Sequence, residues 1–214
     1  MTLEGIKIRL RNYYIRVTAA TRQKKLKNTD FTVISNNCWG GLVYESYNLP
    51  KQSPTVGMYF MAEEYIRFVS NLKYYLCDCK MEFIPPEEAR HKDFYAQDSR
   101  FGTYPIARVG DVEIAMLHYH SEAEALEKWE RRCQRVNWDR MIVKMNDQNG
   151  CTAEHAYAFG KLNLAHKVFF TVKDLDAGDC TVRIPGSGQQ AILSTQEPYG
   201  ASRRFNVDQF VNNL

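Results

Sequence analysis

The chain has 214 residues, of which 44% are hydrophobic and 13% aromatic, and its formal net charge at pH 7 is +3. This length suits one substantial core and is too short for two large domains. The apolar share excludes wholesale disorder, and no apolar run reaches the ~20 residues that cross a bilayer. Since no secretory signal is recognised, we expect a cytoplasmic protein whose six cysteines stay as free thiols.

The first predicted element is a basic amphipathic helix over residues 5–27. It belongs to a leading segment, 1–28, that precedes a single α/β domain, 29–214. Eight lysines or arginines and no acidic residue lie between residues 5 and 29, which favours either peripheral contact with an anionic membrane surface or sugar-phosphate polymer, or a solvated helix surface. Apolar residues recur at helical spacing and are expected to pack on the sheet, the alternative being a partly detached helix. They are Ile6, Leu10, Tyr13, Tyr14, Val17 and Ala20.

Strands and helices then alternate along the chain. A hairpin is predicted around Gly110-Asp111, and Ser121 followed by Glu124 predicts a capping box. This order indicates an α/β fold, a three-layer α/β/α single domain with a mostly parallel mixed sheet. We expect strands at 30–35, 55–60, 81–84, 106–109, 112–118, 141–145, 167–172 and 181–184, and helices at 40–48, 62–76, 121–135, 152–162 and from 208.

The polar turn formed by residues 35–41 is the most informative segment, because a strand runs into it and a helix follows. Backbone N–H groups at such a junction point into the crevice where α/β proteins bind anions. Amide side chains and paired glycines favour a phosphate or carboxylate ligand, while the alternative is a turn that satisfies its own backbone. The turn matches neither a dinucleotide fingerprint nor a P-loop. The predicted ligand-binding residues are Ser35, Asn36, Asn37, Cys38, Trp39, Gly40 and Gly41, with Ser53 and Thr55 as a neighbouring wall.

Two residues are predicted to be catalytic. His118 ends a predicted strand just before a capped helix, where acid–base residues collect in α/β folds, and Asp147 follows the strand at 141–145. His118 and His120 would share one side of a continued strand, but two histidines without carboxylates are a weak metal signal. No metal and no cofactor are therefore predicted. Cys38, beside a helix start, is either a nucleophile or a packing residue.

The string Ser35-Asn36-Asn37-Cys38-Trp39-Gly40-Gly41 also carries a resemblance. Together with residues 53–57 and 68–76, and with residues 118–119, 129–132 and 137–139, it resembles the bacterial domain-of-unknown-function 1919 family over about residues 5–210. Members of this family are often labelled exopolysaccharide or capsule biosynthesis proteins. The resemblance implies a cytoplasmic three-layer α/β fold and supplies no catalytic residues.

The expected function is a transferase of bacterial surface-polysaccharide biosynthesis that acts on a nucleotide sugar or a phosphate-bearing glycan precursor. The polar turn would hold the phosphate, His118 would act as the base toward an acceptor hydroxyl, and Asp147 would orient that hydroxyl. The alternatives are a non-catalytic glycan-binding or assembly protein and a hydrolase or acyltransferase that uses Cys38. No nucleic-acid partner is expected, because aromatic residues do not interleave with a basic strand face. The oligomeric state is not predicted.

Overall fold

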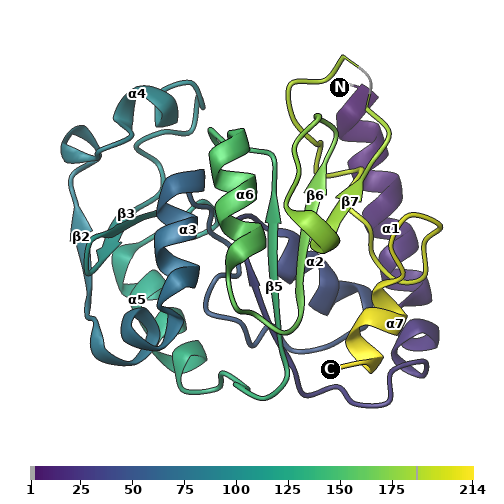
Figure 1. The fold of residues 1–214 in the computed structure, drawn as a ribbon. Helices are drawn as coiled ribbons and strands as arrows, with labels where there is room; N and C mark the ends of the chain where they lie inside the picture. Colours follow the sequence, from purple (N-terminus) through teal and green to yellow (C-terminus); the bar gives the residue numbers. More distant parts are fainter. Residues whose placement is uncertain (1–2, 187) are drawn as a thin grey trace.

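A computed structural model describes residues 3–186 and 188–214 of the chain. Its centre is a parallel sheet of four strands in the order β1-β5-β6-β7, with helices on both faces (Figure 1). The strands are β1 (Thr32–Ser35), β5 (Met141–Asn146), β6 (Lys167–Thr171) and β7 (Thr181–Arg183).

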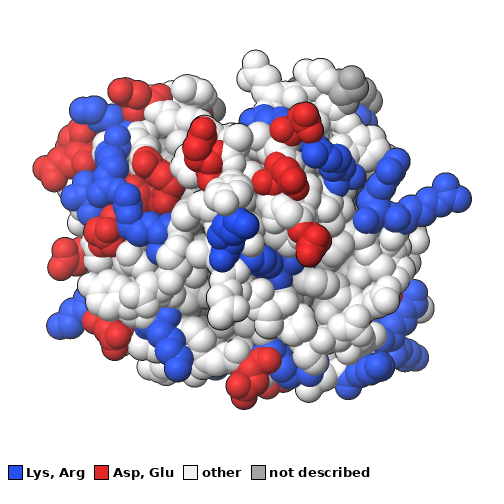
Figure 2. Space-filling model, in the orientation of Figure 1, with Lys and Arg blue, Asp and Glu red and all other residues white. Residues whose placement is uncertain are grey.

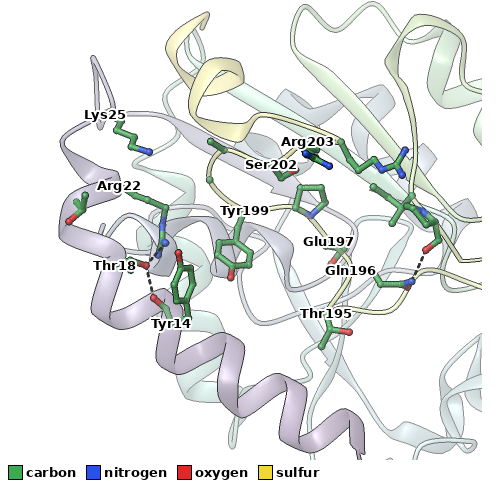
Figure 3. A pocket seen from close by; sticks show the side chains of 17 residues that line it. Tyr14, Thr18, Arg22, Lys25, Thr195, Gln196, Glu197, Tyr199, Ser202 and Arg203 are labelled. Carbon is green, nitrogen blue, oxygen red and sulfur yellow. Dashed lines mark hydrogen bonds between the residues drawn. The ribbon is translucent and has the colours of Figure 1, made fainter.

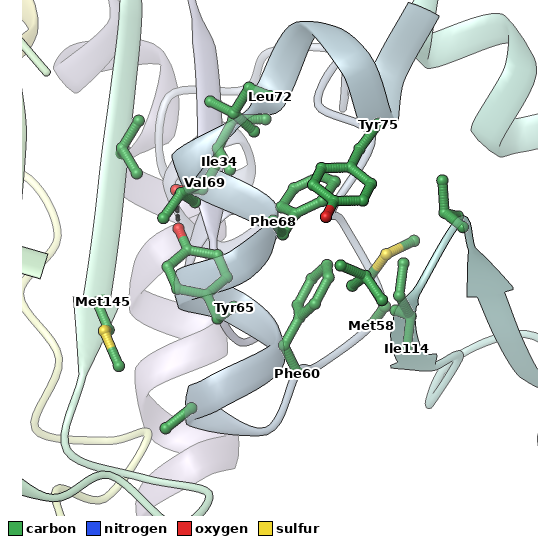
Figure 4. Close-up of a cluster of buried hydrophobic side chains, with 14 of the residues drawn as sticks. Ile34, Met58, Phe60, Tyr65, Phe68, Val69, Leu72, Tyr75, Ile114 and Met145 are labelled. Carbon is green, nitrogen blue, oxygen red and sulfur yellow. Dashed lines mark hydrogen bonds between the residues drawn. The ribbon is translucent and has the colours of Figure 1, made fainter. Parts of the chain in front are cut away.

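Side chains of the parallel strands alternate between two hydrophobic clusters, as the pleat requires. Along β5, Val143 and Met145 join one cluster and Ile142 joins the other. The first cluster is completed by α3 (Ala62–Ser70), α5 (Glu122–Cys133) and α6 (Ala153–Lys161), and Figure 4 shows the aromatic residues of α3 at its centre. The second is completed by α2 (Trp39–Ser46) and α7 (Val207–Asn212). The α/β class and the layered arrangement predicted from the sequence are therefore confirmed.

The antiparallel strands form a second sheet instead of joining the parallel one. It has the order β2-β3-β4 and consists of β2 (Met81–Ile84), β3 (Ile106–Val109) and β4 (Val112–Ala115). The hairpin at Gly110 is confirmed. Residues 55–60 are not the expected strand, because Gly57 takes φ +86° within a turn and only Tyr59 bridges to Ala115.

Shorter helical segments complete the chain. The helix expected over 62–76 stops at Ser70, and a π-helix (η1, Tyr74–Asp78) follows it. Ser121 accepts the N–H of Glu124 at 3.2 Å and so caps α5, whereas the Glu124 carboxylate accepts the N–H of His120 at 3.1 Å. The remaining segments are η2 (Pro86–Glu88), α4 (Lys92–Tyr95) and η3 (Gly178–Cys180).

The leading helix α1 (Leu3–Gln23) packs against α2 with a face different from the predicted one. Its buried side chains are Ile15, Ala19 and Arg22, and the Arg22 guanidinium is satisfied by carbonyl oxygens such as that of Ser46, at 2.7 Å. The prediction that the apolar positions pack on the sheet is wrong, since Ile6, Leu10, Tyr13, Tyr14, Val17 and Ala20 are all exposed. Among the described residues, no helix combines the length and the apolar character needed to span a membrane.

Candidate functional site

A cavity of about 950 Å³, the main cavity, opens at the carboxyl end of β1. The turn after β1 and the start of α2 form one wall, and the segment after β4 brings His118 to the cavity. Clefts of this size beyond the carboxyl ends of parallel strands are common ligand sites. Five of the predicted site residues line the main cavity, namely Asn37, Cys38, Trp39, Gly41 and His118.

Other predicted residues brace the polar turn without lining the main cavity. Ser35 Oγ accepts the N–H of Gly40 at 3.1 Å, and the Ser35 N–H donates to Thr55 Oγ1 at 3.1 Å. A Cβ at Gly40 would lie 3.3 Å from the carbonyl oxygen of Val33, a tight contact, so the close approach of helix and strand favours glycine. The residues outside the lining are Ser35, Asn36, Gly40, Ser53, Thr55 and Asp147.

A buried polar network, which sequence reasoning missed, lies behind the polar turn. Lys144, on β5, is fully buried and pairs with Glu197 from the C-terminal loop. Its ammonium also donates to Asn37 Oδ1 at 2.9 Å, while the Asn36 amide donates to Asn146 Oδ1 at 2.8 Å. Burial lowers the pKa of Lys144, and the charge of Glu197 opposes that shift. The asparagine amides are thus bonded within the protein and shape the turn.

The first N–H groups of α2 are also bonded within the protein. Asn37 Oδ1 accepts the N–H of Trp39 at 3.1 Å, in addition to the Gly40 bond already described. The cationic groups that reach the main cavity are instead side chains that sequence reasoning missed, Arg11, Lys51 and Arg100. They come from three distant segments, so no local motif joins them.

His118 is held in place through the turn that contains Gly57. The His118 N–H donates to the carbonyl of Gly57 at 2.9 Å, and the Tyr119 hydroxyl donates to the carbonyl of Val56 at 2.5 Å. Arg132 donates to that hydroxyl at 2.6 Å. Burial, followed by the charges of Arg100 and Lys51, lowers the pKa of His118 below its ordinary value of 6.5. The imidazole is therefore neutral at pH 7 and able to accept a proton.

β4 ends at Ala115, so His118 and His120 do not share one face of a continued strand. Only His118 lines the main cavity. The backbone N–H of His120 bonds to Glu124 at the start of α5. The two histidines therefore offer a matched pair, with one at the candidate site and one outside it.

Cys38 lines the main cavity as a protonated thiol. Burial, with the charge of Glu197, raises its pKa to about 11. A nucleophilic cysteine needs a lowered pKa, so this environment disfavours the role of nucleophile.

Asp147 ties together the ends of two strands and the C-terminal loop. Its Oδ2 accepts the Thr171 hydroxyl at 2.9 Å and the Val172 N–H at 2.8 Å, and its Oδ1 accepts the Ile192 N–H at 2.8 Å. The carboxylate is 1% exposed and lies outside the lining of the main cavity. These contacts assign Asp147 a structural role in place of the catalytic role expected from the sequence.

One cluster has the donor types of a metal site, with ligand atoms of Glu63, Glu64 and His91 within 4.8 Å of one another. Glu64 is also paired with Arg67 and Arg90. The arginines already neutralise the charge of Glu64, so the contacts are those of an ion-pair cluster around one buried carboxylate.

A second cavity of about 740 Å³, the basic cavity, lies between α1 and the C-terminal loop (Figure 3). Its cationic lining residues are Arg22, Lys25, Arg203 and Arg204. Glu197 is the one carboxylate of this lining, and it also lines the main cavity.

Comparison with known proteins finds one family model that matches nearly the whole chain. The family model described as "Domain of unknown function (DUF1919)" matches residues 9–212, which include the polar turn and His118. An "Uncharacterized protein" of Haemophilus influenzae (strain ATCC 51907 / DSM 11121 / KW20 / Rd) is 33% identical over 170 residues. The aligned region covers 79% of this chain and 75% of that relative.

Proposed function

We propose that this chain, which belongs to the DUF1919 family of domains of unknown function, is a transferase acting on a nucleotide sugar or another phosphate-bearing glycan precursor. One observation carries the proposal: His118 and the polar turn line the same cavity, although 77 residues or more separate them in the chain. The resemblance noted in the sequence suggests bacterial surface-polysaccharide biosynthesis, exopolysaccharide or capsule, as the pathway.

The charges of the main cavity support a phosphate-bearing substrate. Arg11, Lys51 and Arg100 reach its lining, and a guanidinium group binds phosphate oxygens through two parallel hydrogen bonds. Two of these cationic side chains form ion pairs in the structure, Lys51 with Glu45 and Arg100 with Asp98. A volume of about 950 Å³ accommodates a ligand as large as a nucleotide sugar.

His118 supplies the base in this proposal. Its neutral imidazole takes the proton of the acceptor hydroxyl while the hydroxyl oxygen bonds to the anomeric carbon of the donor sugar. The bond from that carbon to the donor phosphate breaks, and the phosphate leaves with the bonding electrons toward the cationic side chains. Positioned general bases of this kind contribute about 10²–10⁴-fold to rate.

The test combines ligand binding and turnover. Nucleotide sugars, with and without manganese, should raise the melting temperature of the protein in a concentration-dependent way. His118→Gln should keep that shift and lower turnover by about 100-fold or more, whereas the matched control His120→Gln should keep both. A panel in which no nucleotide sugar raises the melting temperature, or full turnover in His118→Gln, contradicts the proposal.

The pH dependence of turnover follows from the lowered pKa of His118. A base acts only when deprotonated, so the rate should rise with pH through a value below 6.5 and stay level near pH 7. His118→Gln should remove that acidic limb of the profile. An acidic limb centred well above 6.5 would assign the proton transfer to another group.

A non-catalytic glycan-binding or assembly protein is the second candidate, and the aromatic side chains of Tyr59 and Phe94 in the same lining favour it. It predicts a melting shift with glycans and no turnover. The third, a Cys38-dependent hydrolase or acyltransferase, is disfavoured by the pKa of about 11. Alkylation of Cys38 should abolish turnover only in that third case and should cause a partial, steric loss in the first.

A further inference from the structure

The outer face of α1 carries an apolar stripe formed by Ile6, Leu10, Tyr13, Tyr14 and Val17. These positions follow the spacing of one helix face. In the part of the chain that the structure describes, nine large apolar side chains are exposed, and five of them form this stripe. Leu10 is 65% exposed and Tyr13 is 69% exposed. A concentration of this kind on one helix marks an interaction surface.

Basic side chains border the apolar stripe on both sides. At 3.6 residues per turn, Arg9 and Arg16 lie along one border and Lys7 lies along the other, and all three residues are exposed. Figure 2 shows lysine and arginine side chains along the edge of the molecule where α1 lies, with few acidic side chains among them. Residues 5–29 contain no acidic residue at all. The surface is therefore apolar along its middle and cationic at its borders.

The basic cavity extends this cationic surface. Tyr14 belongs to the apolar stripe and also lines the basic cavity, as does Lys25 further along the chain (Figure 3). On the opposite wall, Arg203 and Arg204 are exposed. The single carboxylate of that lining, Glu197, is already paired with Lys144. Anionic groups that approach α1 thus meet cations both on the helix and next to it.

An apolar stripe with cationic borders favours an anionic membrane surface as the partner over a second copy of the chain. A second copy of the chain would bring an identical cationic border against this one, and like charges repel. An anionic bilayer offers phosphates for the basic borders and an acyl boundary for tyrosine, leucine, isoleucine and valine. Helices with an apolar face flanked by lysine and arginine lie in the plane of such an interface.

We propose that α1 docks the protein on an anionic membrane surface. The apolar stripe enters the boundary between headgroups and acyl chains, and Arg9, Arg16 and the mouth of the basic cavity contact lipid phosphates. The docking face is distinct from the lining of the main cavity, to which α1 contributes Ile8, Arg11 and Asn12. The inference therefore stands independently of the proposed reaction.

Co-sedimentation of the full chain with lipid vesicles tests the inference without substrate. The protein should bind vesicles that contain phosphatidylglycerol and should bind pure phosphatidylcholine vesicles at least about tenfold more weakly. Leu10→Ser/Val17→Ser should lower binding by about tenfold or more, because two apolar side chains leave the interface. Arg9→Gln/Arg16→Gln should lower binding to the anionic vesicles by about tenfold or more.

Tyr157→Ser is the matched control, since Tyr157 is a 63% exposed aromatic residue on α6 and should leave binding unchanged. The stripe side chains point outward, so circular dichroism should be the same for all variants. A salt titration of the wild-type protein is a test without substitutions, because added salt should weaken binding to anionic vesicles. Absence of binding to anionic vesicles, or equal binding by Leu10→Ser/Val17→Ser, overturns the inference. So does a dimer in size-exclusion chromatography that Leu10→Ser/Val17→Ser dissociates, because a second copy would then cover the stripe.

Discussion

Two buried carboxylates in this protein are neutralised in opposite ways. Glu197 is 3% exposed, and among the described residues its one cationic partner is Lys144, which is itself fully buried. Glu64 is 0% exposed, but its arginine partners have side chains that are 38% and 42% exposed, for Arg67 and Arg90, and His91 Nε2 lies 2.9 Å from it. Glu197 depends on a single buried charge, whereas Glu64 draws on several groups at the surface.

The fold should rely more on the Lys144–Glu197 pair than on the pairs of Glu64. A buried charge that loses its partner keeps the full desolvation penalty, because no water replaces the partner. A carboxylate with several half-exposed partners retains most of its stabilisation when one of them is removed. The region behind the polar turn should therefore be the more sensitive of the two.

The largest effect is expected for Glu197→Ala. This change leaves the buried Lys144 ammonium without its carboxylate partner, and breaking a buried pair costs about 3–5 kcal/mol of unfolding free energy. Urea denaturation followed by circular dichroism measures the loss.

The double variant Lys144→Met/Glu197→Leu is the control, because it removes both charges together. It should be markedly more stable than Glu197→Ala. A loss below about 1 kcal/mol in Glu197→Ala, the range of surface pairs, would place the pair in contact with water and remove the contrast with Glu64.

Glu64→Gln should have an intermediate effect, about 1–3 kcal/mol at neutral pH, from lost charge-assisted hydrogen bonds. Burial alone would raise the pKa of Glu64, but the bonds from His91 and the Glu113 N–H, with the charges of Arg90 and Arg67, lower it below 4.5. A carboxyl with a lowered folded-state pKa stabilises the fold above its unfolded-state value, and this stability is lost as the pH falls through the lowered value. Urea midpoints measured from neutral to acidic pH should converge for wild type and Glu64→Gln at the acidic end. Parallel curves would mean that the carboxylate does not stabilise the fold by its charge.

Arg67→Gln should have the smallest effect, below about 1 kcal/mol, because Arg90 and His91 still contact Glu64 and the Arg67 side chain is partly solvated. Thermal unfolding at low and at high salt measures it, and the small difference should shrink further at high salt. A loss as large as that of Glu64→Gln would make Arg67 the dominant partner.

Much of the fold followed from periodicity, but the orientation of α1 did not. Its apolar spacing correctly predicted a helix, yet the face with the larger apolar side chains lies in solvent. The buried face includes Arg22, whose guanidinium finds acceptors such as the Ser46 carbonyl only once the chain is folded. A pattern of polarity cannot anticipate such partners. Gly57 likewise prevented a strand at 55–60, because its positive φ turns the backbone.

The candidate site was predicted in outline, as the polar turn and His118 share a cavity. The buried lysine was missed, although a lysine within the apolar run of β5 was a visible signal that some acidic partner must lie nearby. The partner itself, Glu197, is 53 residues away in a loop, and nothing local identifies it. The place of Asp147 after a strand predicts a catalytic role, but its carboxylate accepts hydrogen bonds from the Thr171 hydroxyl and from backbone groups on other segments, which the sequence does not identify.

Gly57 sets the position of the His118 imidazole, the proposed base. A Cβ at this position would lie 3.1 Å from the ring of Tyr119, and φ +86° strains any side-chain-bearing residue. The carbonyl of Gly57 accepts the backbone N–H of His118. A substitution at Gly57 would therefore displace His118 through the backbone, without a side-chain contact between the two residues. The position of that imidazole in the main cavity is thus set by a residue that has no side chain.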